Sequence, residues 1–82
     1  MEIRDAIRRR VDELLKNKKM TRYELCKKVA MHESTVRNLY REGTTNKSVS
    51  MNTAFLLAEG FDMTILEFLD SPLFSFENIE TN

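Results

Sequence analysis

Apolar residues recur at intervals of three and four along most of this 82-residue chain, and this spacing limits its fold more than any other feature. Side chains at these intervals share one face of an α-helix. The alternation of apolar and polar residues that marks a half-buried strand does not occur in the sequence. The pattern predicts an all-α fold whose first helix runs to about residue 17, with an inward stripe of Ile3, Ala6, Ile7, Val11, Leu14 and Leu15.

Three short polar motifs predict where further helices begin. Thr21 and Glu24, and again Thr64 and Glu67, have the spacing of a capping box, in which a hydroxyl and a carboxylate each accept a hydrogen bond from a backbone amide. Ser50 is the third candidate cap, ahead of an apolar stripe. These motifs predict one helix over about 21–29, a fourth helix after residue 50 and a short fifth helix after residue 64.

A third helix is predicted over about 33–41, after a break in the apolar pattern at residues 30–32. Val36 and Leu39 form its inward stripe, and Gly43 stands where a helix-terminating glycine belongs. The segment that follows is rich in Thr, Asn and Ser and predicts a loop. Two short helices joined by a tight turn are the geometry of a helix-turn-helix.

The length allows one domain with one modest core. We expect residues 1–70 to form a five-helix domain, and residues 71–82 to form a short tail that begins near Pro72. The apolar side chains of the tail need cover. They either fold back onto their own core or pack across a dimer, and we favour the dimer; they are Leu73, Phe74, Phe76 and Ile79.

The formal net charge of zero hides a division of the chain into a basic and an acidic part. All 13 Lys and Arg residues lie between Arg4 and Lys47, against 7 acids in that part, for a net charge of +6. The remainder holds 6 acids and no basic residue. We expect a polyanion to bind the first part. The run of Arg8, Arg9 and Arg10, with Lys16, Lys18 and Lys19, has an alternative interpretation as the solvated face of the first helix.

The outward positions of the predicted third helix carry polar, hydrogen-bonding side chains. Asn bonds an adenine edge with two hydrogen bonds, Arg does so with guanine, and Ser or Thr bonds either a base or a phosphate. A carboxylate in the first turn either accepts from a cytosine amine or stabilises the helix dipole. This inventory predicts a helix that reads DNA in a major groove. Its outward residues are Glu33, Ser34, Thr35, Arg37, Asn38 and Arg41.

The sequence also resembles the Cro and lambda-repressor-like helix-turn-helix family of bacterial and phage regulators, often called the XRE family. Two segments carry the resemblance to the helix-turn-helix of the family. The opening of the family's helix 2 is matched by Thr21-Arg22-Tyr23-Glu24-Leu25-Cys26, and the start of its recognition helix by Ser34-Thr35-Val36. The family's fourth and fifth helices are matched, in order and spacing, by four further segments: Ser50-Met51-Asn52-Thr53, Leu57-Ala58, Phe61-Asp62-Met63-Thr64 and Glu67-Phe68-Leu69. The resemblance covers roughly residues 3–69. It implies a five-helix lambda-repressor-like domain and dimeric operator binding.

The resemblance also implies which residues contact DNA. Base contacts are expected from Arg22, at the start of the second helix, and from Glu33, Ser34, Thr35, Arg37 and Asn38. The family places residue 32 among the base contacts as well, but for a histidine in the turn we expect a phosphate contact. Phosphate contacts are therefore expected from Thr21, His32, Arg41, Asn46 and Lys47, which position the domain without reading sequence.

Together these features predict a sequence-specific transcriptional regulator, a repressor that binds a pseudo-palindromic operator in double-stranded DNA as a homodimer. The alternative is a protein-interaction module, such as an antitoxin-like or regulatory partner protein. One His and one Cys, His32 and Cys26, offer no metal site or nucleophile–base pair, so we expect no enzyme activity and no cofactor. A single cysteine and no apolar span or signal segment lead us to expect a cytoplasmic protein that does not enter a membrane.

Overall fold

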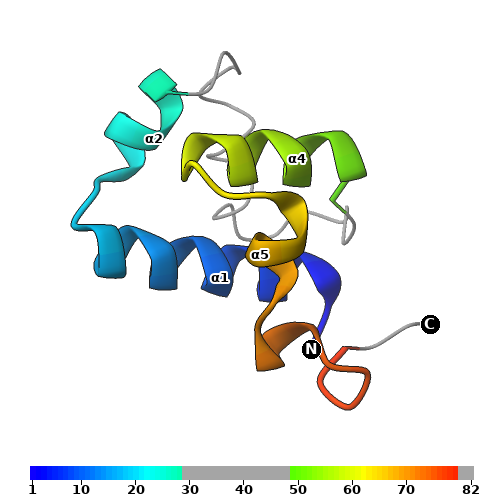
Figure 1. Cartoon of the computed structure of the whole chain (residues 1–82). Helices are drawn as coiled ribbons and strands as arrows, with labels where there is room; N and C mark the ends of the chain where they lie inside the picture. Colours follow the sequence, from blue (N-terminus) through cyan, green and yellow to red (C-terminus); the bar gives the residue numbers. More distant parts are fainter. Residues whose placement is uncertain (29–48, 80–82) are drawn as a thin grey trace, which may run out of the picture.

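The computed structural model describes residues 1–28 and 49–79, and the regular structure within these ranges is entirely helical (Figure 1). The predicted all-α class is confirmed for this part of the chain. The predicted third helix, 33–41, lies outside the described residues, so the expected total of five helices stays a prediction. The described elements are α1 (Ile3–Lys18), α2 (Arg22–Lys28), α4 (Met51–Gly60), α5 (Ile65–Leu69) and the short 3₁₀ helix η1 (Pro72–Phe74).

Three helices begin at the predicted caps. The Thr21 hydroxyl accepts from the Glu24 amide at 3.1 Å, and the Glu24 carboxylate accepts from the Thr21 amide at 3.2 Å. The Ser50 hydroxyl accepts a backbone N–H in the first turn of α4 at 3.1 Å. Thr64 and Glu67 form the second capping box at 3.0 and 3.1 Å. Each motif satisfies backbone donors that a helix start leaves without an intrahelical partner.

The C-terminal cap of α1 forms without the glycine that usually marks such a cap. Lys19 follows the helix in the left-handed conformation, with φ of 53°. The Met20 amide then donates to the Leu15 carbonyl at 2.9 Å, which is the hydrogen bond of a Schellman cap. Met20 packs against the core and so adds the apolar contact that accompanies such caps. The helix ends one residue beyond the predicted end.

The core lies where α1, α2, α4 and α5 converge. Contacts join α2 to α4, α4 to α5, and η1 to α1. None of the described helices has the length and apolar character that crossing a membrane requires. The buried apolar cluster consists of Ile7, Val11, Leu14, Leu15, Leu25, Ala54, Leu57, Ala58, Phe61 and Phe68.

The described part of the tail is divided between its own core and solvent. Phe74 packs against the core cluster, and its ring centroid lies 6.3 Å from that of Phe68. Phe76 remains 86% exposed. The Asn78 carbonyl accepts from the Met1 amino group at 2.6 Å, so the tail also contacts the first residue of the chain. Phe74 therefore folds back onto the core of its own chain, and the dimer contact expected of the tail stays a prediction.

Candidate nucleic-acid interface

In the first helix of the predicted helix-turn-helix, α2, Leu25 belongs to the core cluster and Cys26 packs against it. Leu25 is fully buried, and α2 contacts α4. The predicted contact residues Thr21 and Arg22 are exposed at the opening of this helix, as a DNA contact requires. The Thr21 hydroxyl and amide also serve the capping box with Glu24. The remaining predicted contacts lie outside the described residues: His32, Glu33, Ser34, Thr35, Arg37, Asn38, Arg41, Asn46 and Lys47.

The surface of α2 that faces away from the core carries a pair that the sequence reasoning did not single out. Tyr23 and Lys27 are four residues apart, so they are neighbours on one face of the helix. The Lys27 ammonium lies 4.9 Å from the centroid of the Tyr23 ring, within the range of a cation–π interaction. The i, i+4 spacing of an aromatic and a lysine on an expected helix is the signal that could have found this pair.

The last residue of α2, Lys28, forms an ion pair with Asp62 in the turn between α4 and α5. The Lys28 ammonium donates to the Asp62 carboxylate at 2.5 Å. Asp62 adopts a left-handed conformation, with φ of 57°, which Asp tolerates better than most residues do. The hydrogen bond from Lys28, and then its charge, lower the pKa of the Asp62 carboxyl. The pair joins the basic and acidic parts of the sequence in space.

We expect Lys28→Gln to raise the pKa of Asp62 back toward its ordinary value of 3.8. A pKa lowered by folding means that the pair stabilises the fold above the ordinary pKa, and that this contribution is lost as the pH falls through the lowered value. An NMR titration of the Asp62 carboxyl measures the shift. Lys27→Gln, one residue away, is the matched control and should leave that pKa unchanged. Equal effects of the two substitutions would show that general charge, and not the ion pair, sets the pKa.

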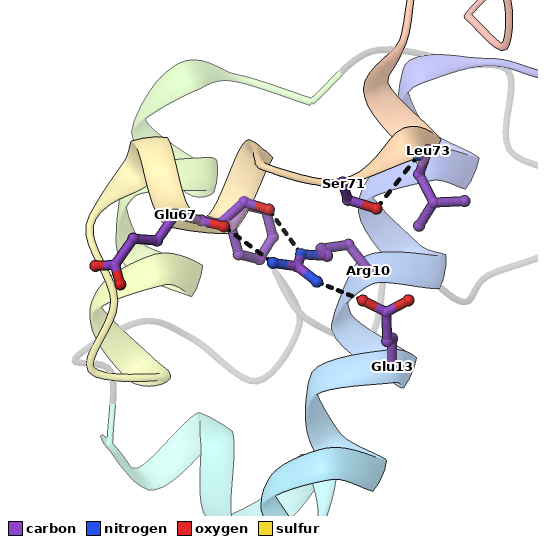
Figure 2. Close-up of polar contacts among 6 residues, drawn as sticks. Arg10, Glu13, Glu67, Ser71 and Leu73 are labelled. Atoms are coloured by element: carbon purple, nitrogen blue, oxygen red, sulfur yellow. Dashed lines mark hydrogen bonds and ion pairs between the residues drawn. The ribbon is translucent and has the colours of Figure 1, made fainter.

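The arginine run in α1 has two different environments, and Arg10 departs from the expectation of a basic, solvated surface. Arg10 is buried, and its guanidinium points from α1 to the last turn of α5 (Figure 2). Its Nε donates to the Phe68 carbonyl at 2.7 Å and its Nη2 to the Glu67 carbonyl at 2.9 Å. Its Nη1 pairs with the Glu13 carboxylate. Arg10 therefore caps the carbonyl end of α5, where helical carbonyls lack intrahelical partners, and is not available to DNA.

The periodicity of α1 held the signal for this role. Arg10 stands three residues after Ile7 and four before Leu14, on the same stripe as the apolar residues. Arg8 lies 3.7 Å from Asp5 at the helix surface. The other members of the basic group are exposed, which fits both a solvated face and a contact with a polyanion: Arg9, Lys16, Lys18 and Lys19.

A comparison with protein families decides what this helical arrangement is. The family model of the Cro/C1-type HTH DNA-binding domain matches residues 10–72. The chain belongs to this family. No curated protein and no solved structure gives a significant match. The family assignment confirms the resemblance found in the sequence.

The matched range places the described elements within a Cro/C1-type domain. It begins in α1, contains α2, α4 and α5, and ends at Pro72, the first residue of η1. It also contains the segment 33–41 that the sequence pattern predicts to be the recognition helix. A Cro/C1-type HTH domain supports the role of a DNA-binding regulator. The assignment of α2 as the first helix of the DNA-binding motif stays a prediction.

Proposed function

We propose that this Cro/C1-type protein is a sequence-specific repressor that occupies a pseudo-palindromic operator as a homodimer. The observation that carries the proposal is the family match over residues 10–72, which spans both helices of the expected helix-turn-helix. The exposure of Thr21 and Arg22 at the start of α2 supports it. We also propose that the protein functions in the cytoplasm, without a cofactor or an enzymatic activity.

We assign recognition of the DNA sequence to side chains near the N-termini of the two helices of the helix-turn-helix. In a helix-turn-helix the second helix enters the major groove, and its first residues contact base edges. We assign base contacts to Arg22, Glu33, Ser34, Thr35, Arg37 and Asn38. Phosphate contacts, which set the position of the domain on the duplex, are assigned to Thr21, His32, Arg41, Asn46 and Lys47.

We propose a homodimer because one recognition helix makes too few base contacts for useful specificity. Each good bidentate base contact contributes about 1–3 kcal/mol of discrimination, and one helix makes few of them. Two-fold symmetry doubles the number, and the operator then has matching half-sites. We place the dimer contact in the tail, residues 71–82. The support for this is Phe76, whose large apolar side chain is 86% exposed.

Selection from a random duplex pool, at two salt concentrations, tests the proposed function. We expect the wild-type protein to enrich a motif with two-fold symmetry, with an affinity that falls as salt rises, because bound phosphates release counterions. Combined replacement Arg37→Ala and Asn38→Ala should abolish the sequence preference. These two side chains have the strongest chemistry for reading guanine and adenine.

Arg9→Ala is the matched control for this experiment. Arg9 is exposed on α1, outside the expected recognition helix, so the variant loses one positive charge and should keep the wild-type motif. A pool without an enriched motif, together with weak binding at low salt, would contradict the proposal. That result would favour the protein-interaction module instead.

A further inference from the structure

The last two residues of α2 are lysines in different electrostatic environments. Lys28 is paired with Asp62 at 2.5 Å. Lys27 is exposed, and the contact described for it is with the face of the Tyr23 ring at 4.9 Å. An anion that approaches Lys28 must compete with a carboxylate, whereas an anion that approaches Lys27 meets an ammonium whose positive charge is not neutralised by the uncharged ring.

We infer that Lys27, held over the ring of Tyr23, binds a backbone phosphate of the DNA, and that Lys28 does not. The inference rests on the proposed function and adds a contact that the sequence did not predict. Three observations carry it: the position of the pair on α2, the exposure of the aromatic ring, and the difference between the two lysines.

The position of the pair follows from the burial of Leu25. Residues on a helix are separated by about 100° around its axis, so side chains two positions before and after residue 25 lie on the opposite side. Tyr23 and Lys27 therefore occupy the face of α2 that points away from the core. In a helix-turn-helix the first helix crosses the DNA backbone, so phosphates lie close to this helix.

The exposed ring is explained better by this contact than by packing. Tyr23 is 61% exposed, so its ring contributes little to the buried core. Its face instead limits the positions of a long and flexible lysine side chain. A lysine whose freedom is already reduced loses less entropy when it binds a phosphate. Tyr23 is thus a positioning residue, and Lys27 makes the contact.

The test measures how the DNA affinity of three variants depends on salt, on the motif selected by the wild-type protein. We expect Lys27→Gln to lower the slope of log affinity against log salt by about 0.9, the value for one phosphate contact, without changing which bases are preferred. Lys28→Gln is the matched control and should keep the wild-type slope. Tyr23→Leu should weaken binding about two- to fivefold, because a lysine without the ring loses more side-chain freedom when it binds.

Two further measurements separate this role from a merely structural one. Tyr23→Phe keeps the ring face and should bind as tightly as the wild type. Tyr23→Leu should have no further effect when Lys27→Gln is already present, because both changes remove the same interaction. Unchanged slope in Lys27→Gln, or an equal change in Lys28→Gln, would overturn the inference while leaving the proposed function intact. Failure of the wild-type protein to bind duplex DNA would overturn both.

Discussion

Phe68→Ala should lower the free energy of unfolding by about 3–5 kcal/mol, the range for removing a buried aromatic side chain. Phe68 is fully buried in the core cluster and packs beside the ring of Phe74. Its loss leaves a cavity where α5 and η1 meet the core. A chain of this size has a total stability of roughly 4–12 kcal/mol, so the loss removes a large share of it. Urea unfolding followed by circular dichroism measures the change.

Phe76→Ala provides the control for this prediction. It removes the same side chain from the same end of the protein, but Phe76 is 86% exposed. We expect its effect to stay within about 0.5 kcal/mol at protein concentrations where the chain is monomeric. Similar losses in the two variants would mean that the tail, and not the core position of Phe68, determines the effect.

Arg10→Ala should destabilise the protein by about 2–4 kcal/mol, although it removes a charged side chain. The guanidinium of Arg10 donates to the carbonyls of Glu67 and Phe68. Without it the Glu67 carbonyl still accepts from the Asp70 amide at 3.2 Å, whereas the Phe68 carbonyl, in a buried hydrogen bond, loses this donor. An unsatisfied buried polar group costs about 1–3 kcal/mol. The aliphatic part of the side chain is also buried, which adds a packing loss. Thermal and urea unfolding of the variant measure the effect.

Two variants separate the hydrogen bonds of Arg10 from its charge and its volume. Arg9→Ala removes the same charge from an exposed neighbouring position and should change stability by less than about 0.5 kcal/mol. Arg10→Met keeps most of the volume but no donor, so it should retain most of the loss. A variant Arg10→Ala as stable as Arg9→Ala would show that the α5 carbonyls do not depend on this side chain.

The helix starts were predictable because a cap is a local structure. Thr21, Ser50 and Thr64 each bond a backbone amide three residues ahead, so the residues concerned are close together in the sequence. The apolar stripe of α1 was predictable for the same reason, since helical periodicity acts over one or two turns. The end of α1 was less visible, because Lys19 takes a conformation that is usually marked by glycine.

The sequence predicted the type of domain that forms the candidate site, but only some of the residues that matter in it. The sequence indicated a helix-turn-helix, and the family match confirms the type of domain. It did not distinguish Lys27 from Lys28, which have the same chemistry and adjacent positions. The distinction comes from Asp62, which lies 34 residues further along and reaches only Lys28. A pattern over neighbouring residues carries no information about a partner at that separation.

The sequence by itself determined the helical class, the starts of α2, α4 and α5, and the family to which the domain belongs. Only the tertiary structure decided that Arg10 caps α5, that Asp62 engages Lys28, and that Phe74 folds back while Phe76 stays exposed. The physical reason is the range of the interactions. Caps and helical stripes depend on residues within one or two turns, whereas these pairings depend on how the helices pack.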